Sequence, residues 1–440
     1  MTIYETAQFL LRQAKKNGAT GSCVLVSEVD AYGILREQGN ERPEITHKRK
    51  MSLEVHVGRR VAHVSGSAGS RESLTRLLLK AVEMAKASTE DPFASVAGEP
   101  LWPRDMARLS DSLDLVDRSL LPSLCELSQT AHALEDAALS QKGITRTEGV
   151  SSAALRKYEI TMNSEGFTGL SERTTHVRSV EAVAGDGEHM VEGSDMDVRI
   201  HRSDLRSSLS IGTLAAERAL AQVGTTSVPG GRMPVVFDKL ISSSLIGALL
   251  AGITGSRVYS KSTFLKEYLG ERICDPSITI IDHPHIPRMG KSRLYDADGV
   301  GARYLPIVVD GVLKTWLTSL KSSVKLAVRC TGHGGNTSGN IIVGNGIVSQ
   351  RELIADIPRG LLITSLLGHG ANIETGNYSY GAKGFLIENG KICRPVDEMT
   401  IAGNLLDAFG RMRVANDRDM RLSVSVPSIR VDDVTVAGKN

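Results

Sequence analysis

The second half of the chain carries short apolar runs joined by turn dipeptides, and this pattern constrains the fold more than any other feature. Asp310-Gly311 joins two such runs, and Asn389-Gly390 joins two more. Asp-Gly and Asn-Gly between β-forming residues predict two-residue hairpins, because both turn positions need a positive φ. Asn345-Gly346 is a weaker signal of the same kind. We therefore expect residues 234–440 to form one β-rich, glycine-rich domain with a barrel-like sheet.

The first unit of the N-terminal half predicts strands followed by a covering helix. Residues 51–57 alternate apolar and polar side chains, and a period of two is typical of a half-buried strand. Ser70 stands where the cap of the next helix is expected, ahead of leucines and alanines at helical spacing. The short basic run at 47–50 is interpreted as a charged turn before the strand.

The next unit follows a proline-rich connector and again combines strands with a covering helix. We expect a helix starting near Ser119, strands over 153–162 and 168–183, and a second helix over 203–223. Strands with covering helices, followed by a β-rich part, predict an α+β fold. The expected units are an N-terminal α/β unit (1–104), a central strand-plus-helix unit (105–223) and the C-terminal domain (234–440).

Charge and cysteine usage limit the partners and the compartment. The 52 basic and 50 acidic residues leave a net charge of +2, which predicts neither nucleic acid nor a membrane as a ligand. The five cysteines are scattered and form no CxxC pair, which favours a reducing compartment. Residues 1–17 lack the features of a signal peptide, and the apolar run 245–253 is too short to span a bilayer. We expect a cytoplasmic protein.

A search for catalytic motifs finds no complete site. The chain has no GxSxG elbow, no complete P-loop and no three-glycine dinucleotide fingerprint. Four histidines of the second half form a candidate zinc set: His283 and His285 on either side of Pro284, His333 three residues after Cys330, and His369 between two glycines. Loop histidines with ordinary hydrogen bonds are the other interpretation, and both stay open here.

The residues of the last third resemble a known family. Residues 368–379, 381–385, 387–392 and 400–405 form a specific string, and residues 255–265 support it. Shorter matching loops are residues 91–93, 163–166, 282–285, 298–300 and 331–333. Together they cover nearly the whole chain, which resembles the TldD/PmbA family, also labelled "modulator of DNA gyrase". Within the family, the chain is similar to the PmbA (TldE) branch.

The resemblance implies that this chain has no catalytic residue of its own. TldD-type chains carry His-Glu-x-x-x-His on the helix after the first strand of the C-terminal domain. Here the two ligand positions correspond to Gly247 and Gly252, and the glutamate position to Ala248. The C-terminal cysteine ligand is also missing, because residues 419–440 contain no cysteine. No cofactor is therefore expected in this chain, and zinc is expected in a TldD-type partner.

The implied function is that of a PmbA/TldE-like, non-catalytic subunit of a cytosolic zinc metallopeptidase that degrades or trims unfolded peptides. Its expected partners are an HExxxH-bearing TldD-like subunit, in a heterodimer, and the peptides themselves, with a homodimer of the isolated chain left open. His369 and Tyr378 are candidates for lining the peptide cavity. Two alternatives remain: an independent metal-dependent hydrolase using His283, His285, His333 and His369, or a homodimeric peptide-binding protein without catalysis.

Overall fold

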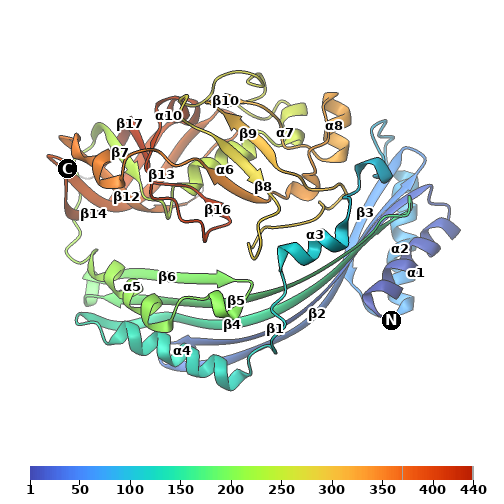
Figure 1. Cartoon of the computed structure of the whole chain (residues 1–440), viewed down its shortest axis with the longest axis horizontal. Helices are drawn as coiled ribbons and strands as arrows, with labels where there is room; N and C mark the ends of the chain where they lie inside the picture. The colour runs from blue at the N-terminus through green and yellow to red at the C-terminus, as the bar shows by residue number, and fades with distance from the viewer. Residues whose placement is uncertain (369, 439–440) are drawn as a thin grey trace.

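The computed structural model describes residues 1–368 and 370–438. One long, curved, antiparallel sheet spans the N-terminal half, in the order β3-β2-β1-β4-β5-β6 (Figure 1). Its strands are β1 (Gly21–Glu37), β2 (Asn40–Val57), β3 (Arg60–Ser67), β4 (Ile144–Asn163), β5 (Thr168–Ala184) and β6 (Val191–Arg199). The pairing of β1 with β4 joins the strands of the first and second expected units into one sheet. The expected limits of those units remain a prediction.

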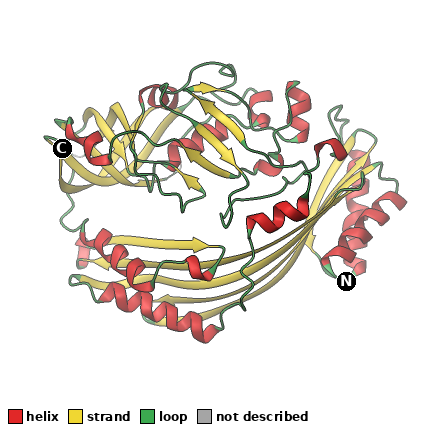
Figure 2. Ribbon diagram, in the orientation of Figure 1, coloured by secondary structure: helices red, strands yellow, loops and turns green. Residues whose placement is uncertain are grey.

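Two helix pairs cover opposite ends of the same face of this sheet. Near one end, α1 (Ile3–Lys16) and α2 (Arg71–Ala87) pack over a core that includes Val24 and Val26 of β1. Near the other end, α4 (Leu124–Leu139) and α5 (Ser208–Leu220) pack over a core that includes Ile34 of the same strand. Val24, Val26 and Ile34 are separated by even numbers of residues, so their side chains point to the same face of the sheet. Both helix pairs therefore lie on one side of it. Figure 2 shows them on the outer, convex side, with the C-terminal half facing the inner side.

Several N-terminal predictions are confirmed and others need correction. Ser70 caps α2 by accepting a hydrogen bond from Ser73 N. The prediction of a charged turn at residues 47–50 is wrong, since this basic run lies inside β2 and pairs with β1. The helix expected near Ser119 begins at Leu124, because the Ser123 hydroxyl accepts from Glu126 N in a capping box. The connector also holds an unexpected helix, α3 (Met106–Leu113).

The C-terminal half contains a closed five-stranded barrel, which confirms the expected β-rich, barrel-like domain. The order β14-β13-β12-β7-β17 closes on itself through pairing of β14 with β17. These strands are β7 (Gly231–Phe237), β12 (Arg359–Leu367), β13 (Asn377–Glu388), β14 (Lys391–Asn404) and β17 (Ile429–Ala437), with β15 (Arg413–Val414) attached to β17. The expected α+β fold is therefore present.

A smaller five-stranded sheet packs beside the barrel in the order β10-β9-β8-β11-β16. Its strands are β8 (Ile280–His283), β9 (Leu305–Val309), β10 (Val312–Leu313), β11 (Asn340–Val343) and β16 (Val424–Ser425). Helix α6 (Ser243–Gly252) contributes Leu245, Ile246 and Leu249 to the core cluster that the barrel and this sheet share. The remaining helices are α7 (Gly255–Tyr259), α8 (Leu320–Leu326), α9 (Gln350–Ala355) and α10 (Leu405–Arg411).

Two of the three predicted hairpin turns are present. Asp310 and Gly311 both have positive φ, 49° and 76°, between β9 and β10, and Asn389 and Gly390 likewise join β13 to β14. Positive φ at both positions is the geometry of a type I′ turn. Asn345-Gly346 joins no hairpin, because β11 is followed by α9.

Aromatic contacts pack the C-terminal half against the long sheet. The Phe167 ring stands between Trp102 and Tyr295, at centroid distances of 5.6 Å and 5.1 Å. Tyr295 lies so close to Gly169 of β5 that a Cβ there would come within 2.5 Å of the Tyr295 ring. These contacts cross between segments far apart in sequence, so the relative placement of the two halves is built into the core.

Candidate functional site

Helix α6 carries the three positions that correspond to the zinc motif of TldD-type chains. Gly247 and Gly252 have no side chain, and the Ala248 methyl has no donor atom. A Cβ at Gly247 would meet open space, whereas one at Gly252 would lie 3.1 Å from Leu265 Cδ1 and 3.3 Å from Thr263 Oγ1. These residues therefore do not fit a zinc ion: the donors are missing, and the second ligand position is also crowded.

A cavity of about 650 Å³ opens beside the C-terminal end of this helix. Its walls come from four separate segments: the end of α6, helix α7 with the turn after it, Leu317 ahead of α8, and the loop that precedes β11. The lining residues are Leu250, Ala251, Thr254, Ser256, Arg257, Tyr259, Ser260, Ser262, Leu317, His333, Thr337 and Ser338. The volume falls in the range of ~300–1,000 Å³ that is usual for small-ligand sites.

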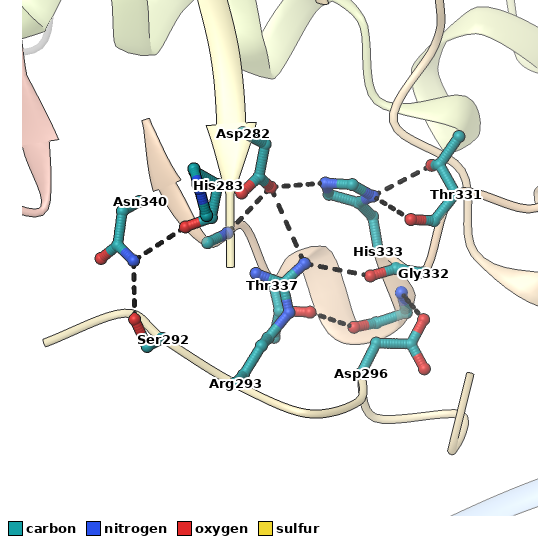
Figure 3. A network of polar contacts seen from close by, with 12 residues as sticks. Asp282, His283, Ser292, Arg293, Asp296, Thr331, Gly332, His333, Thr337 and Asn340 are labelled. Atoms are coloured by element: carbon teal, nitrogen blue, oxygen red, sulfur yellow. Dashed lines mark hydrogen bonds and ion pairs between the residues drawn. The ribbon is translucent and has the colours of Figure 1, made fainter. Parts of the chain in front are cut away.

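His333 is the buried polar residue of the cavity wall, and its contacts are drawn in Figure 3. Its Nε2 lies 2.9 Å from Asp282 Oδ2, and its Nδ1 lies 2.9 Å from Thr331 Oγ1. The side chains of His333 and Asp282 are 3% and 1% exposed. Because both ring nitrogens are engaged within the protein, neither is free to take a proton from a ligand without breaking a contact. The geometry suits a residue that holds the cavity wall in place.

Asp282 organises the polar network behind His333. The same carboxylate accepts a hydrogen bond from Gly339 N at 2.9 Å and lies 3.8 Å from Arg293 Nη2. Burial lowers the pKa of Arg293, whose Nη2 also donates to Gly332 O. Buried charges are tolerated when they are paired and hydrogen-bonded. This network therefore fixes the loop 331–339 against β8.

Two further carboxylates face the same loop. Asp296 accepts hydrogen bonds from Gly334 N, Asp298 N and Val300 N, yet burial raises its pKa. Burial, followed by the charge of Asp296, raises the pKa of Asp298 to about 6. Asp298 also lines a second cavity of about 370 Å³ between the long sheet and the C-terminal half, where Glu54 and Lys321 face it. A carboxyl group with this pKa changes charge near neutral pH.

His283 and His285 of the candidate zinc set do not join His333. The His283 ring packs edge-on against Tyr304 at 5.4 Å, and burial lowers the pKa of His285. His369 lies outside the described residues. Over residues 1–368 and 370–438, one group of three histidine, cysteine or carboxylate ligand atoms lies within 4.8 Å of one another, namely Glu28, Asp30 and His47. His283, His285 and His333 are not brought together in such a group.

Tyr378, the other candidate for the peptide cavity, is 4% exposed in the C-terminal core. Burial raises its pKa to about 12, and its ring lies 6.0 Å from that of Tyr380. It is not among the residues that line the cavity beside α6. A peptide-lining role for His369 and Tyr378 therefore stays a prediction. Arg257 and Ser338 line the cavity but are not among the site residues predicted from the sequence, because only the fold brings their two segments together.

Similarity to known proteins agrees with this architecture. Residues 117–223 match the PmbA/TldA metallopeptidase central domain, and residues 230–438 match the PmbA/TldA metallopeptidase C-terminal domain. The metalloprotease PmbA of Escherichia coli O157:H7 is 30% identical over 439 residues, covering 99% of this chain and 96% of that protein. A metalloprotease PmbA homologue of Haemophilus influenzae is 28% identical with the same coverage.

Solved structures share the whole fold. The crystal structure of a proposed modulator of DNA gyrase from Bacteroides thetaiotaomicron superposes with a TM-score of 0.90 at 26% identity, covering 99% of both chains. TldE from Thermococcus kodakarensis has a TM-score of 0.80 at 19% identity, with 98% of this chain and 100% of that chain covered. None of the helices described here combines the length and apolar composition that crossing a bilayer requires. By sequence and by fold, this chain belongs to the PmbA/TldD metallopeptidase family.

Proposed function

We propose that this chain is the PmbA/TldE-type, non-catalytic subunit of a cytosolic TldD/TldE-type zinc metallopeptidase that degrades or trims unfolded peptides. The observation that carries the proposal is helix α6. Its motif positions are Gly247, Ala248 and Gly252, and the last of these is packed against Thr263 and Leu265. A chain of a metallopeptidase family without zinc ligands at the motif positions needs a partner that supplies them.

The relatives and the cysteines support the finer parts of the proposal. The two full-length relatives named above are PmbA proteins described as metalloproteases. All five cysteines of this chain are free, as expected in a reducing cytosol. The partner would be a TldD-like chain with HExxxH, which would hold the zinc ion and activate water for peptide hydrolysis.

Co-expression with the TldD-type chain of the same organism tests the proposal. A tag on this chain alone should retain the partner, and the purified complex should cleave an unstructured peptide. Replacing the glutamate of the partner's HExxxH motif by glutamine should abolish cleavage and leave the complex intact. Peptide cleavage by this chain alone would overturn the proposal in favour of an independent hydrolase. A stable homodimer that ignores the partner and binds peptide uncleaved would favour a peptide-binding protein.

A further inference from the structure

The cavity beside α6 has an unusual charge distribution for a pocket lined by so many polar residues. Arg257 lines it, and the lining set contains no aspartate or glutamate within the described part of the chain. Asp282 stands behind His333 and is not itself a lining residue. A cationic lining without a compensating carboxylate favours an anionic ligand.

Arg257 is available to such a ligand. The Arg257 side chain is exposed. Within the described part of the chain, its guanidinium forms no ion pair and no side-chain hydrogen bond. The hydroxyls of Ser256 and Ser338 are likewise without an intramolecular partner over the same residues. Together they offer the planar donor pair of a guanidinium and two hydroxyl donors, from segments about eighty positions apart in the chain.

An apolar wall completes the cavity, and a second cation, which is not itself a lining residue, stacks on one of the lining side chains. Lys325 of α8 places its Nζ 4.3 Å from the centre of the Tyr259 ring, which lines the cavity. Leu250, Ala251 and Leu317 supply the apolar part of the lining. The site thus presents donors for an anion next to space for an apolar group.

A carboxylate fits this arrangement, because arginine binds carboxylates in a bidentate geometry and hydroxyls donate to the same oxygens. We propose that the cavity binds the C-terminal carboxylate of an unfolded peptide, with the last side chain against Leu250 and Leu317. This inference rests on the proposed function and deepens it, since it gives this subunit a part in substrate capture. The free end of the peptide would be held here while the rest of the chain extends toward the partner.

Fluorescence anisotropy on the purified full-length chain tests the inference. The probes are an unstructured peptide labelled at its N-terminus, made once with a free C-terminal carboxylate and once as the C-terminal amide. The free acid should bind at least about tenfold more tightly than the amide, a difference of ~1.4 kcal/mol. Sodium acetate should compete with the free acid, and a peptide ending in an amide but carrying internal glutamates should bind as weakly as the plain amide.

Substitutions at Arg257 test whether the preference for the free acid over the amide arises in this cavity. Arg257→Ala should reduce binding of the free acid to that of the amide, and Arg257→Lys should retain part of the preference because it keeps charge without the planar fork. Arg351→Ala, an exposed arginine of α9 outside the cavity lining, removes the same charge and should leave the preference unchanged. Unchanged thermal melting of each variant confirms that it is folded.

Equal affinity for acid and amide, no binding of either, or an unaltered preference in Arg257→Ala would overturn the inference. Tight binding of the amide carrying internal glutamates would assign the site to acidic side chains and would also overturn it. Failure here is distinguishable from failure of the proposed function, because complex formation and cleavage by the partner are measured separately. Arg257→Ala should still co-purify with the TldD-type chain.

Discussion

His333 Nε2 lies 2.9 Å from Asp282 Oδ2, and the two side chains are 51 positions apart in sequence and almost fully buried. The contact joins the loop before β11 to the end of β8, so a wall of the cavity depends on a buried polar contact. The other ring nitrogen contacts the Thr331 hydroxyl. Both ring nitrogens of His333 are thereby engaged within the protein. This favours a structural role for His333, which is a candidate metal ligand on sequence grounds.

Asp282→Ala should therefore destabilise the protein strongly. The substitution removes the buried hydrogen-bond partner of Gly339 N and His333 and the carboxylate that lies 3.8 Å from Arg293 Nη2, and breaking a buried pair in this way costs about 3–5 kcal/mol. Urea denaturation followed by circular dichroism measures the loss. Asp136→Ala, at an exposed position of α4, is the control and should change the free energy of unfolding by less than about 0.5 kcal/mol. A loss at Asp282 no larger than in the control would contradict the account.

The two glycines of α6 should respond differently to substitution by alanine. Gly247→Ala adds a methyl group in open space inside a helix and should stabilise by about 0.5–1 kcal/mol. Gly252→Ala should be neutral or destabilising, and Gly252→His should cost about 1–3 kcal/mol, because the side chains of Leu265 and Thr263 already lie close to this position and must shift.

The same two positions can be used to test whether a zinc site can be introduced into α6. Introducing the motif with Gly247→His, Ala248→Glu and Gly252→His together should not create a tight zinc site, because the side chains of Leu265 and Thr263 crowd the position of the second histidine. Isothermal titration with zinc measures this directly. Stoichiometric tight binding by a folded triple variant would show that crowding at Gly252 is unimportant.

Asp197 of β6 ties the two halves of the molecule together. Its Oδ2 accepts hydrogen bonds from Arg421 Nη2 at 2.6 Å and from Arg206 N at 2.7 Å, with the side chain 3% exposed. Asp197→Ala should lower the free energy of unfolding by about 3 kcal/mol and speed proteolysis between the halves. Ser194→Ala on the same strand is the matched control. Identical proteolysis rates for both variants would contradict the proposal that the contact between Asp197 and Arg421 holds the two halves together.

Asp298 should give the protein a pH-dependent stability. Burial and Asp296 raise its pKa from 3.8 to about 6 in the folded protein, so the folded state holds this proton more tightly than the unfolded chain. The stability from this group is full below pH 3.8 and is lost as the pH rises through about 6.

Asp298→Asn removes the titration and keeps an oxygen that can accept from Leu320 N. Its stability relative to the wild type should rise between pH 4 and pH 7, by at most about 3 kcal/mol. Thermal melting of both proteins across this range measures the difference, with Asp136→Asn as the baseline. A difference that does not vary with pH would contradict the assignment.

Local patterns predicted the elements that have one buried face. The alternation at residues 51–57 lies where β2 packs beneath α2, and the dipeptides Asp310-Gly311 and Asn389-Gly390 need only their own two residues to define a turn. The basic run 47–50 misled for a physical reason. It lies in the middle of a very long strand, between the two helix pairs, where neither face is deeply buried and no alternation of apolar residues is required.

The site was less accessible to sequence reasoning. The resemblance identified Gly247, Ala248 and Gly252 as motif positions without zinc donors, but the crowding at Gly252 comes from residues 263–265 folding back on the helix. The cavity itself requires α6, α7 and the loop before β11 to meet, and no spacing along the chain encodes that meeting. The contact between His333 and Asp282 likewise depends on the tertiary fold and is not encoded by any spacing along the chain.

The zinc content of the purified chain tests the central claim most directly. The protein should be produced without its partner, exchanged into chelator-free buffer and analysed by elemental mass spectrometry, with the TldD-type chain as a positive control. We expect less than about 0.1 zinc per chain here and about one per TldD-type chain. A content close to about one zinc per chain would contradict the non-catalytic assignment and would make His283, His285, His333 and His369 the residues to mutate next.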